Sequence, residues 1–192
     1  KQYTDMPFLI MLDEHEDTYK AGRFLRASDL GFETENAEWK PVIIDGNTND
    51  IIVPNGTMGQ RWEEHAKWNL ILENEDGTII DPAMSVENHG AEWTDIVFPY
   101  FESQGDGTFK RSIPVKKVAL ADGTTRLVAT VYDLMLSQYG VRREGAQHVA
   151  NGYEDETSIY TPAWQESITN VKPELVIQIA REFAQNALDT GG

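Results

Sequence analysis

Two arginines three residues apart are the first side chains in this sequence that could take part in chemistry. Arg23 and Arg26 lie in the stretch TYKAGRFLRASDL, residues 18–30. A guanidinium group presents several N–H donors in a planar fork that suits oxyanions. If the stretch is helical, a spacing of three places both side chains on one face. The pair is our candidate for guiding an anionic substrate, and the simpler alternative is a helix-surface ion pair between Arg26 and Asp29.

The remaining polar residues offer no self-contained catalytic or metal site. The chain has no cysteine, so thiolate zinc sites, iron–sulfur ligands and cysteine nucleophiles are excluded within these residues. His15 lacks the second histidine one helical turn on that a helical zinc site needs, and the other three histidines are scattered. No phosphate-binding glycine loop, serine elbow or His-Glu-x-x-His motif is present. We therefore assign no catalytic residue and no metal ligand.

One segment imitates a calcium loop at its start only. Asp45, Asn47 and Asn49 occupy the first, third and fifth positions of such a loop. The loop also requires a glycine where Asp50 stands and a bidentate glutamate where Gly56 stands. The segment is therefore interpreted as a hairpin turn.

The overall charge excludes polyanionic partners. The 192 residues contain 32 acidic and 16 basic side chains, a formal net charge of −16. Long-range repulsion of this size opposes binding to nucleic acid and to anionic lipid. An ordinary acidic surface and adaptation to high salt, where repulsion between carboxylates is screened, both remain open as explanations of the acidity.

The elements that must position these residues form a mixed α/β pattern. The apolar run Phe8–Leu12 predicts a strand covered on both faces, and its closeness to the first residue suggests a chain that starts inside a larger protein. Residues 18–30 are predicted to be a helix that begins at Thr18 and ends at Gly31. Hairpins are predicted from the turn dipeptides and flanking apolar runs: residues 41–45 with 51–54, 68–72 with 78–80, and 115–120 with 126–129. A further apolar segment at 96–101 contains Pro99, which favours an edge strand or a strand end.

The last third is predicted to be helical, with a loop at 142–159. A helix follows residue 130 and stops at Gly140. Two more begin at Pro162, with Thr161 as cap, and at Pro173. The last helix carries an apolar stripe of Leu175, Val176, Ile179, Ala180, Phe183 and Ala187. The whole is predicted to be one segment, 1–192, with a possible β-rich insertion at 39–126.

Several stretches carry a family resemblance that spans the whole chain in order. They are YTDMPFLIMLDEHEDTYKAGRFLRASDLG, VPNGTMGQRWEEHAKWNL, FPYF, LADGTTRLVATVYDLMLSQYGV and YTPAWQESITNVKPELVIQIAREFAQNA. In these stretches the chain resembles the catalytic alpha subunit of membrane-bound respiratory nitrate reductase, within the dimethyl sulfoxide reductase family of molybdopterin oxidoreductases. The chain looks like an internal segment of that subunit, which is several times longer.

The resemblance implies a function for the parent subunit. It implies reduction of nitrate to nitrite at a bis(molybdopterin guanine dinucleotide) molybdenum cofactor, in anaerobic respiration and nitrate assimilation. It also implies a 4Fe-4S cluster, an iron–sulfur beta subunit and a membrane quinol-oxidising subunit that together tie the complex to the membrane, on a side that stays open. The ligands of both metal groups are expected outside this chain.

For the segment itself, the resemblance implies a scaffold of the cofactor-binding domain and the wall of a substrate funnel. The two closing helices would pack their apolar stripe on the cofactor-binding sheet. The isolated chain is expected to be inactive and to expose the apolar faces of Phe8–Leu12 and of the last helix. The alternatives are a selenate, chlorate or perchlorate reductase of the same branch, or a non-catalytic acidic binding domain that shares the fold.

Overall fold

The computed structural model describes residues 4–54, 72–74, 76–100 and 107–191. The chain divides into two compact units, Lys1–Met135 and Leu136–Gly192, each of which is described by itself. Helix α1 (Val131–Gln138) spans the division. The expectations for Trp68–Ile71 and Phe101 lie outside the described residues.

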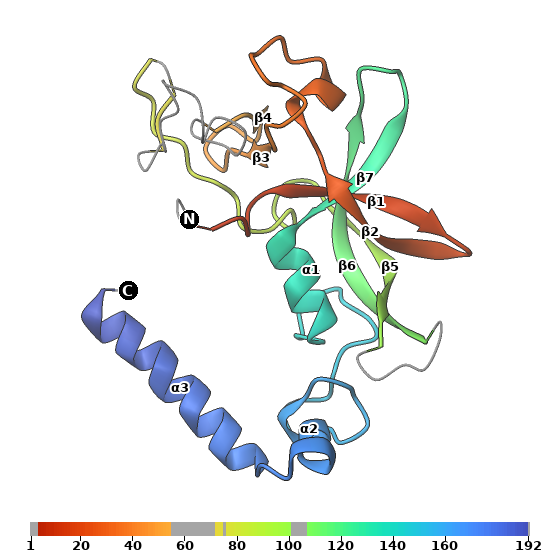
Figure 1. Ribbon diagram of the computed structural model, residues 1–192, viewed down its shortest axis with the longest axis vertical. Coiled ribbons are helices and arrows are strands. Elements are labelled where there is room, and N and C mark those ends of the chain that lie inside the picture. The colour runs from red at the N-terminus through yellow and green to blue at the C-terminus, as the bar shows by residue number, and fades with distance from the viewer. Residues whose placement is uncertain (1–3, 55–71, 75, 101–106, 192) are drawn as a thin grey trace. The chain divides into compact units, whose positions relative to one another are not determined.

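A closed five-stranded barrel organises the first unit (Figure 1). Its strands, in the order in which they pair, are β1 (Leu9–His15), β2 (Thr18–Phe24), β5 (Glu92–Pro99), β6 (Thr108–Ala119) and β7 (Thr125–Thr130). Strand β1 pairs with β7 to close the ring. All pairings are antiparallel except that of β2 with β5, which is parallel.

Two apolar clusters lie on opposite sides of β1, because successive side chains of a strand point to opposite faces. Leu9 and Met11 belong to one cluster, together with Val42, Ile44 and Val86. Leu12 belongs to the other, whose remaining members are Ile96, Phe98, Ile113, Val115 and Ala129. The strand predicted at Phe8–Leu12 is confirmed, and Leu9–Leu12 are buried. The expectation that this run exposes an apolar face is therefore wrong.

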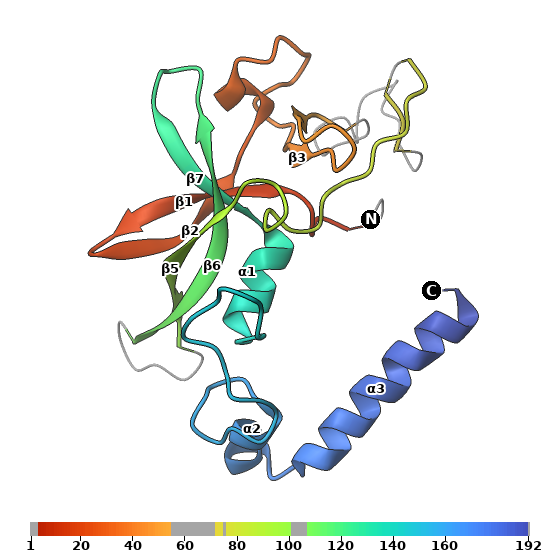
Figure 2. The same ribbon diagram turned by 180° about the vertical axis from the view of Figure 1, so that it is seen from behind.

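The helix predicted at residues 18–30 is also wrong. Residues Thr18–Phe24 form strand β2, and only Ala27–Leu30 form a short 3-10 helix, η1. Figure 2 shows β1 and β2 as neighbouring arrows. Gly22 makes this pairing possible, since a β-carbon there would lie 2.7 Å from the carbonyl oxygen of Met11. The predicted stop is correct, because Gly31 adopts a left-handed φ of 74° at the end of η1.

The predicted hairpins between residues 41 and 54 and around residue 122 are confirmed. Strands β3 (Ile43–Ile44) and β4 (Ile51–Ile52) pair antiparallel. In the turn between them, the backbone N–H of Asn47 donates to Oδ1 of Asp45 at 3.0 Å. A bond of this kind is typical of a turn that begins at Asp, so the residues that imitate a calcium loop form a hairpin turn, as predicted. Strands β6 and β7 form the other hairpin, with Gly123 at a φ of 85°.

The remaining β expectations are met in part. Around Asp76-Gly77, a single antiparallel bridge joins Glu73 to Ile79, and Gly77 has a φ of 83°. Strand β5 ends at Pro99. The mixed α/β content is confirmed. The insertion at 39–126 stays a prediction. Within it, β5 pairs with β2, which lies outside it, and β6 pairs with β7, which continues beyond its end.

A buried carboxylate fixes the start of α1. Asp133, which is fully buried, accepts hydrogen bonds from the hydroxyl of Ser85 at 2.6 Å, the N–H of Val86 at 3.0 Å and the hydroxyl of Thr130 at 2.9 Å. The N–H of Asp133 in turn donates to Thr130 Oγ1 at 3.0 Å, as in a helix cap. The carboxylate thus joins the loop at residues 84–86 to the first turn of α1.

The second unit contains the predicted helix pair. Residues 142–159, all of them described, contain neither helix nor strand, as expected. Helix α2 (Pro162–Thr169) and helix α3 (Pro173–Thr190) both begin at a proline. Thr161 caps α2 by accepting the N–H of Trp164 at 3.1 Å. Helix α1 ends at Gln138, and the predicted stop, Gly140, follows two residues later with a φ of 66°.

Candidate functional site

The two candidate arginines lie on either side of the end of β2. Arg23 belongs to β2 itself, and Arg26 is the residue that precedes η1. Arg23 binds Asp29 with both terminal nitrogens, each at 2.7 Å from a carboxylate oxygen. The ion pair predicted between Arg26 and Asp29 is therefore replaced by one between Arg23 and Asp29. The side chain of Arg23 nevertheless remains 59% exposed.

The ion pair shifts the pKa of both partners. The hydrogen bonds to Asp29 raise the pKa of Arg23. The hydrogen bonds from Arg23 lower the pKa of the Asp29 carboxyl, and the backbone N–H of Arg26, at 2.8 Å, lowers it further. Asp29 is consequently ionised at neutral pH, so it offsets much of the positive charge that Arg23 would present to an incoming anion.

Arg26 makes contacts of another kind. Its Nη1 donates to the carbonyl oxygen of Trp39 at 2.6 Å, and its guanidinium lies over the ring of Phe24, 5.6 Å from the centroid. Both of these partners are neutral, and a guanidinium keeps its charge in such contacts. Asp29 therefore accepts hydrogen bonds from the side chain of Arg23 and from the backbone N–H of Arg26. The side chain of Arg26 contacts neutral groups, so its positive charge is offset less than that of Arg23.

A pocket that sequence reasoning missed lies elsewhere on the barrel unit. It has a volume of about 440 Å³ and is lined by Tyr19, Glu92, Trp93, Lys117, Arg126 and Leu127. Lys117 forms an ion pair with Glu92 at 2.7 Å, which raises the pKa of the lysine. Neither candidate arginine lines it. The sequence signal that could have located part of this pocket is the predicted β6–β7 hairpin, in which Val118 pairs with Arg126. No local sequence pattern predicts that β5 lies beside this hairpin.

A second pocket, of about 350 Å³, belongs to the second unit. Its walls include Tyr139, Arg142, Asn151, Tyr153 and Tyr160. The rings of Tyr139 and Tyr160 meet edge to face at 5.9 Å. The helix and loop signals in the sequence did not bring these residues together.

Asp155 orders the loop that carries part of this pocket. Its carboxylate accepts the backbone N–H groups of Asn151, Thr157 and Ser158 at 3.0, 3.0 and 3.1 Å. These bonds, led by the one from Asn151 and joined by the Thr157 side chain, lower the pKa of Asp155 to about 2. Hydrogen bonds to the ionised form are the cause. The carboxylate thus holds the loop in its turn at neutral pH.

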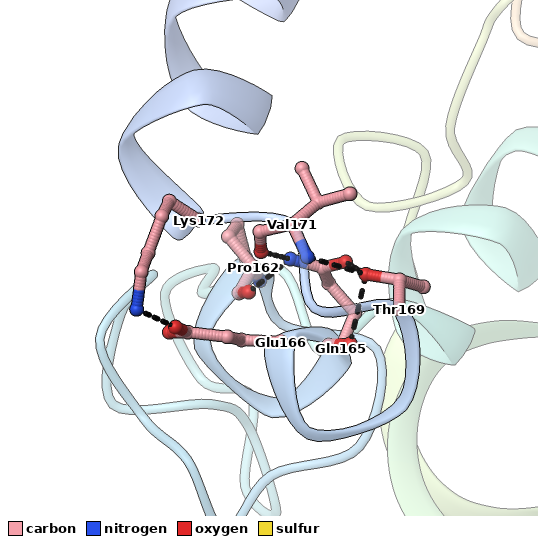
Figure 3. Close-up of polar contacts among 6 residues, drawn as sticks. All are labelled: Pro162, Gln165, Glu166, Thr169, Val171 and Lys172. Carbon is pink, nitrogen blue, oxygen red and sulfur yellow. Dashed lines mark hydrogen bonds and ion pairs between the residues drawn. The ribbon is translucent and has the colours of Figure 1, made fainter.

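The corner between α2 and α3 is fixed by its own polar contacts (Figure 3). The side-chain amide of Gln165 donates to the carbonyls of Pro162 and Val171 at 2.9 and 2.8 Å. The N–H of Val171 donates to Thr169 Oγ1 at 3.2 Å, and Lys172 pairs with Glu166. These contacts set the direction in which α3 leaves α2.

The donor atoms do not form a metal site in the described part of the chain. In residues 4–54, 72–74, 76–100 and 107–191, no group of three or more His, Asp or Glu side chains is placed to hold a metal ion, and the sequence contains no thiolate donor.

None of the described helices combines the length and the apolar character that are needed to cross a membrane.

Comparison with known proteins gives relatives along the whole chain, although no protein-family model matches it. The chain is 45% identical over 193 residues to the nitrate reductase alpha chain of Bacillus subtilis. It is 44% identical over 210 residues to the respiratory nitrate reductase 1 alpha chain of Escherichia coli, and 43% identical over 202 residues to the nitrate reductase alpha subunit of Mycobacterium tuberculosis. Each match covers 100% of this chain and 16% of the relative.

Proposed function

Since this chain belongs to the family of respiratory nitrate reductase alpha subunits, matched from end to end at 38–45% identity, we propose that its parent protein is a molybdenum-dependent nitrate reductase. The full-length match is the observation that carries the proposal. The chain spans 16% of the length of these relatives, so it contributes one part of such an enzyme.

The proposed reaction consumes two electrons and two protons and converts nitrate to nitrite and water. A molybdenum cofactor of the bis(molybdopterin guanine dinucleotide) type supplies the oxygen-accepting centre when bound. We further propose a 4Fe-4S cluster, an iron–sulfur beta subunit and a quinol-oxidising membrane subunit as its electron supply, in anaerobic respiration. The membrane association of the complex belongs to the same proposal.

Within that enzyme, the present residues serve as scaffold and approach surface. The closed barrel and the buried tie through Asp133 provide rigid support of the kind that positions a site built from several segments. Arg23 and Arg26 are proposed to guide nitrate, with Arg26 the stronger of the two for the reason given above. Because the chain spans 16% of the length of its relatives, the separated chain is proposed to be inactive.

The proposal is tested on the full-length subunit, produced with its cofactor-assembly machinery. Molybdenum and iron content would be measured together with viologen-linked reduction of nitrate, chlorate and selenate. Nitrate is expected as the preferred substrate of a molybdenum-containing protein. A preference for chlorate or selenate would mean that nitrate is not the substrate. A protein that contains no molybdenum and reduces no oxyanion would refute the enzymatic proposal and favour an acidic binding domain.

The two arginines are tested in the same assay. Arg26→Gln is expected to raise KM for nitrate by about fivefold at low salt with kcat unchanged, since one unit charge at short range in water contributes about 1 kcal/mol. Arg23→Gln is expected to have the smaller effect, because Asp29 already offsets its charge. Arg181→Gln, at an exposed position on α3, is the control that matches the change in net charge. Equal effects of all three variants would remove the guiding role.

A further inference from the structure

The loop between α1 and α2 contains an asparagine followed by glycine, a pair in which the side chain can react with the backbone. The sequence has two such pairs, Asn55-Gly56, which lies outside the described residues, and Asn151-Gly152. In this reaction, the backbone nitrogen of the following residue attacks the side-chain amide carbon of asparagine. Glycine favours the attack, because it has no side chain to obstruct the approach to its nitrogen.

The structure leaves the attacking nitrogen available. The backbone N–H of Gly152 has no acceptor among the described residues, so no hydrogen bond within that part of the chain must break before the nitrogen reacts. Gly152 has a φ of 123°, and a β-carbon at this position would meet no described atom within 4 Å. The space beside the reacting nitrogen is therefore open.

The amide that is attacked has a cation beside its oxygen. Nη2 of Arg142 lies 3.5 Å from Oδ1 of Asn151. At this length the contact acts through the charge of the guanidinium more than through a strong hydrogen bond. The amide oxygen gains negative charge when a nitrogen adds to the amide carbon, and a cation already in place stabilises that developing charge. Arg142 is therefore positioned to promote the attack.

The backbone of Asn151 is held at the same time. Its N–H donates to Oδ2 of Asp155 at 3.0 Å, and the same carboxylate accepts the N–H groups of Thr157 and Ser158 through its other oxygen. The turn that contains Asn151 is thus ordered on its N-terminal side, while the N–H of Gly152 on its C-terminal side is free among the described residues.

We propose that Asn151 is a site of spontaneous deamidation and that Arg142 promotes the reaction. The nitrogen of Gly152 gives its proton to a solvent base and bonds to Cγ of Asn151. The side-chain nitrogen takes up a proton and leaves as ammonia, which closes a cyclic imide. One water molecule then opens either of the two C–N bonds of the imide ring. The product is an aspartate with a normal backbone or with a backbone that runs through the β-carbon, and no electrons are transferred.

The product changes both the charge and the backbone of the loop. Arg142, Asn151 and Gly152 all line the pocket of about 350 Å³ in the second unit, so a carboxylate at position 151 adds a negative charge to its wall. A backbone that runs through the β-carbon is also longer between the N–H that Asp155 binds and Gly152. Deamidation is therefore expected to loosen the turn that Asp155 holds.

Mass spectrometry of the full-length subunit tests the inference. The native protein would be incubated in mildly alkaline buffer, and peptides that contain position 151 would be followed for the replacement of the side-chain NH2 by OH. A steady rise of the two aspartate products is expected. If the native subunit keeps Asn151 intact while the urea-unfolded chain loses its amide, the fold protects the site and the inference is overturned. Deamidation is measured as a change in mass, so its outcome is independent of molybdenum content and of nitrate reduction.

A pair of variants tests the part played by Arg142. Arg142→Gln is expected to slow deamidation at Asn151 by about fivefold, the effect of one unit charge at short range in water. Arg181→Gln, on α3, removes the same charge elsewhere in the second unit and is expected to leave the rate unchanged. In urea, all three proteins should react at one rate. Equal rates of native Arg142→Gln and native unsubstituted subunit, or equal slowing in both variants, would overturn the role of Arg142. Equal urea midpoints for the two variants would show that neither substitution acts by unfolding the subunit.

Discussion

The barrel unit, residues 1–135, and the helical unit, residues 136–192, differ in how far their apolar side chains are buried. Both apolar clusters of buried residues lie within residues 1–135, where the ring of strands leaves no unpaired edge in the barrel. In the described part of the second unit, the buried apolar residues are Ala150, Ile159, Ala163 and Pro173, and the large side chains of Phe183 and Leu188 on α3 are exposed.

This difference separates two sources of order within one chain. The barrel is held by its own core, and its strand order requires no outside element. The second unit is held by caps, turns and polar contacts such as those at Thr161, Asp155 and Gln165, which are individually modest. The helical unit is therefore the part whose stability should depend on what surrounds it.

A pair of identical substitutions tests the comparison most strongly. In the separated chain, Leu9→Ala is expected to cost about 2–5 kcal/mol of unfolding free energy, because a fully buried side chain leaves a cavity. Leu188→Ala, at an exposed position, is expected to change it by less than about 0.5 kcal/mol. Urea unfolding would measure both. Comparable losses in the two variants would mean that the units do not differ as described.

The buried carboxylate at the end of the barrel unit gives the next largest effect. Asp133→Asn replaces an acceptor of several hydrogen bonds with an amide whose NH2 faces donors. The expected loss is about 1–3 kcal/mol, the cost of buried polar groups left unsatisfied. Urea unfolding would again measure it, with the exposed Glu144→Gln as control. A near-neutral Asp133→Asn would show that the tie between residues 84–86 and α1 contributes little.

In the helical unit, removal of one cap should be visible locally. Thr161→Ala loses the acceptor for the N–H of Trp164 and the donor to the carbonyl of Asp155. A cost of about 1 kcal/mol is typical of a lost N-cap. Hydrogen exchange at the Trp164 amide should accelerate, while Thr161→Ser should restore it. If exchange rises equally in the barrel strands, the two units are not independent in stability.

Acid should loosen the helical unit by a small, defined step. The pKa of Asp155 is lowered from 3.8 to about 2 in the folded chain. Its contribution to stability is therefore fully present above about pH 4 and is lost as pH falls through about 2. Titration of the Asp155 carboxyl by NMR, with exchange at the Thr157 and Ser158 amides, would follow this step, and Asp155→Asn should abolish it. A midpoint near 3.8 would show that the loop bonds are not retained in solution.

The parts of the fold that could be predicted from the sequence are the turns and helix ends, whose conformation depends on one or two neighbouring residues. Asp122-Gly123 and Asp76-Gly77 specify tight turns through glycines of positive φ. Pro162 and Pro173 mark helix starts because their missing N–H is not needed there. Thr161 and Gly140 supply the matching cap and stop. In each case, one or two residues carry the physical cause.

The parts that failed depend on contacts between distant residues. Residues 18–24 have a helical pattern of side chains, but the close approach of β1 at Met11 selects a strand and requires Gly22. Because of this error, Arg23 was expected on a helix, whereas it contacts Asp29 from strand β2. The pocket that includes Lys117 forms because β5 lies next to β6, and no local pattern shows which strands will be neighbours.

The parallel pairing of β2 with β5 has a consequence for folding rate. Its register joins Tyr19 to Ile96 and Lys20 to Val97, and the hydroxyl of Thr18 donates to the carbonyl of Asp95 across 77 residues of sequence at 2.7 Å. Such a contact is formed only after a long loop has closed, which raises contact order and slows folding. During synthesis, the edge of β2 that pairs with β5 stays unpaired until β5 has emerged from the ribosome, and in that interval it can pair with another nascent chain.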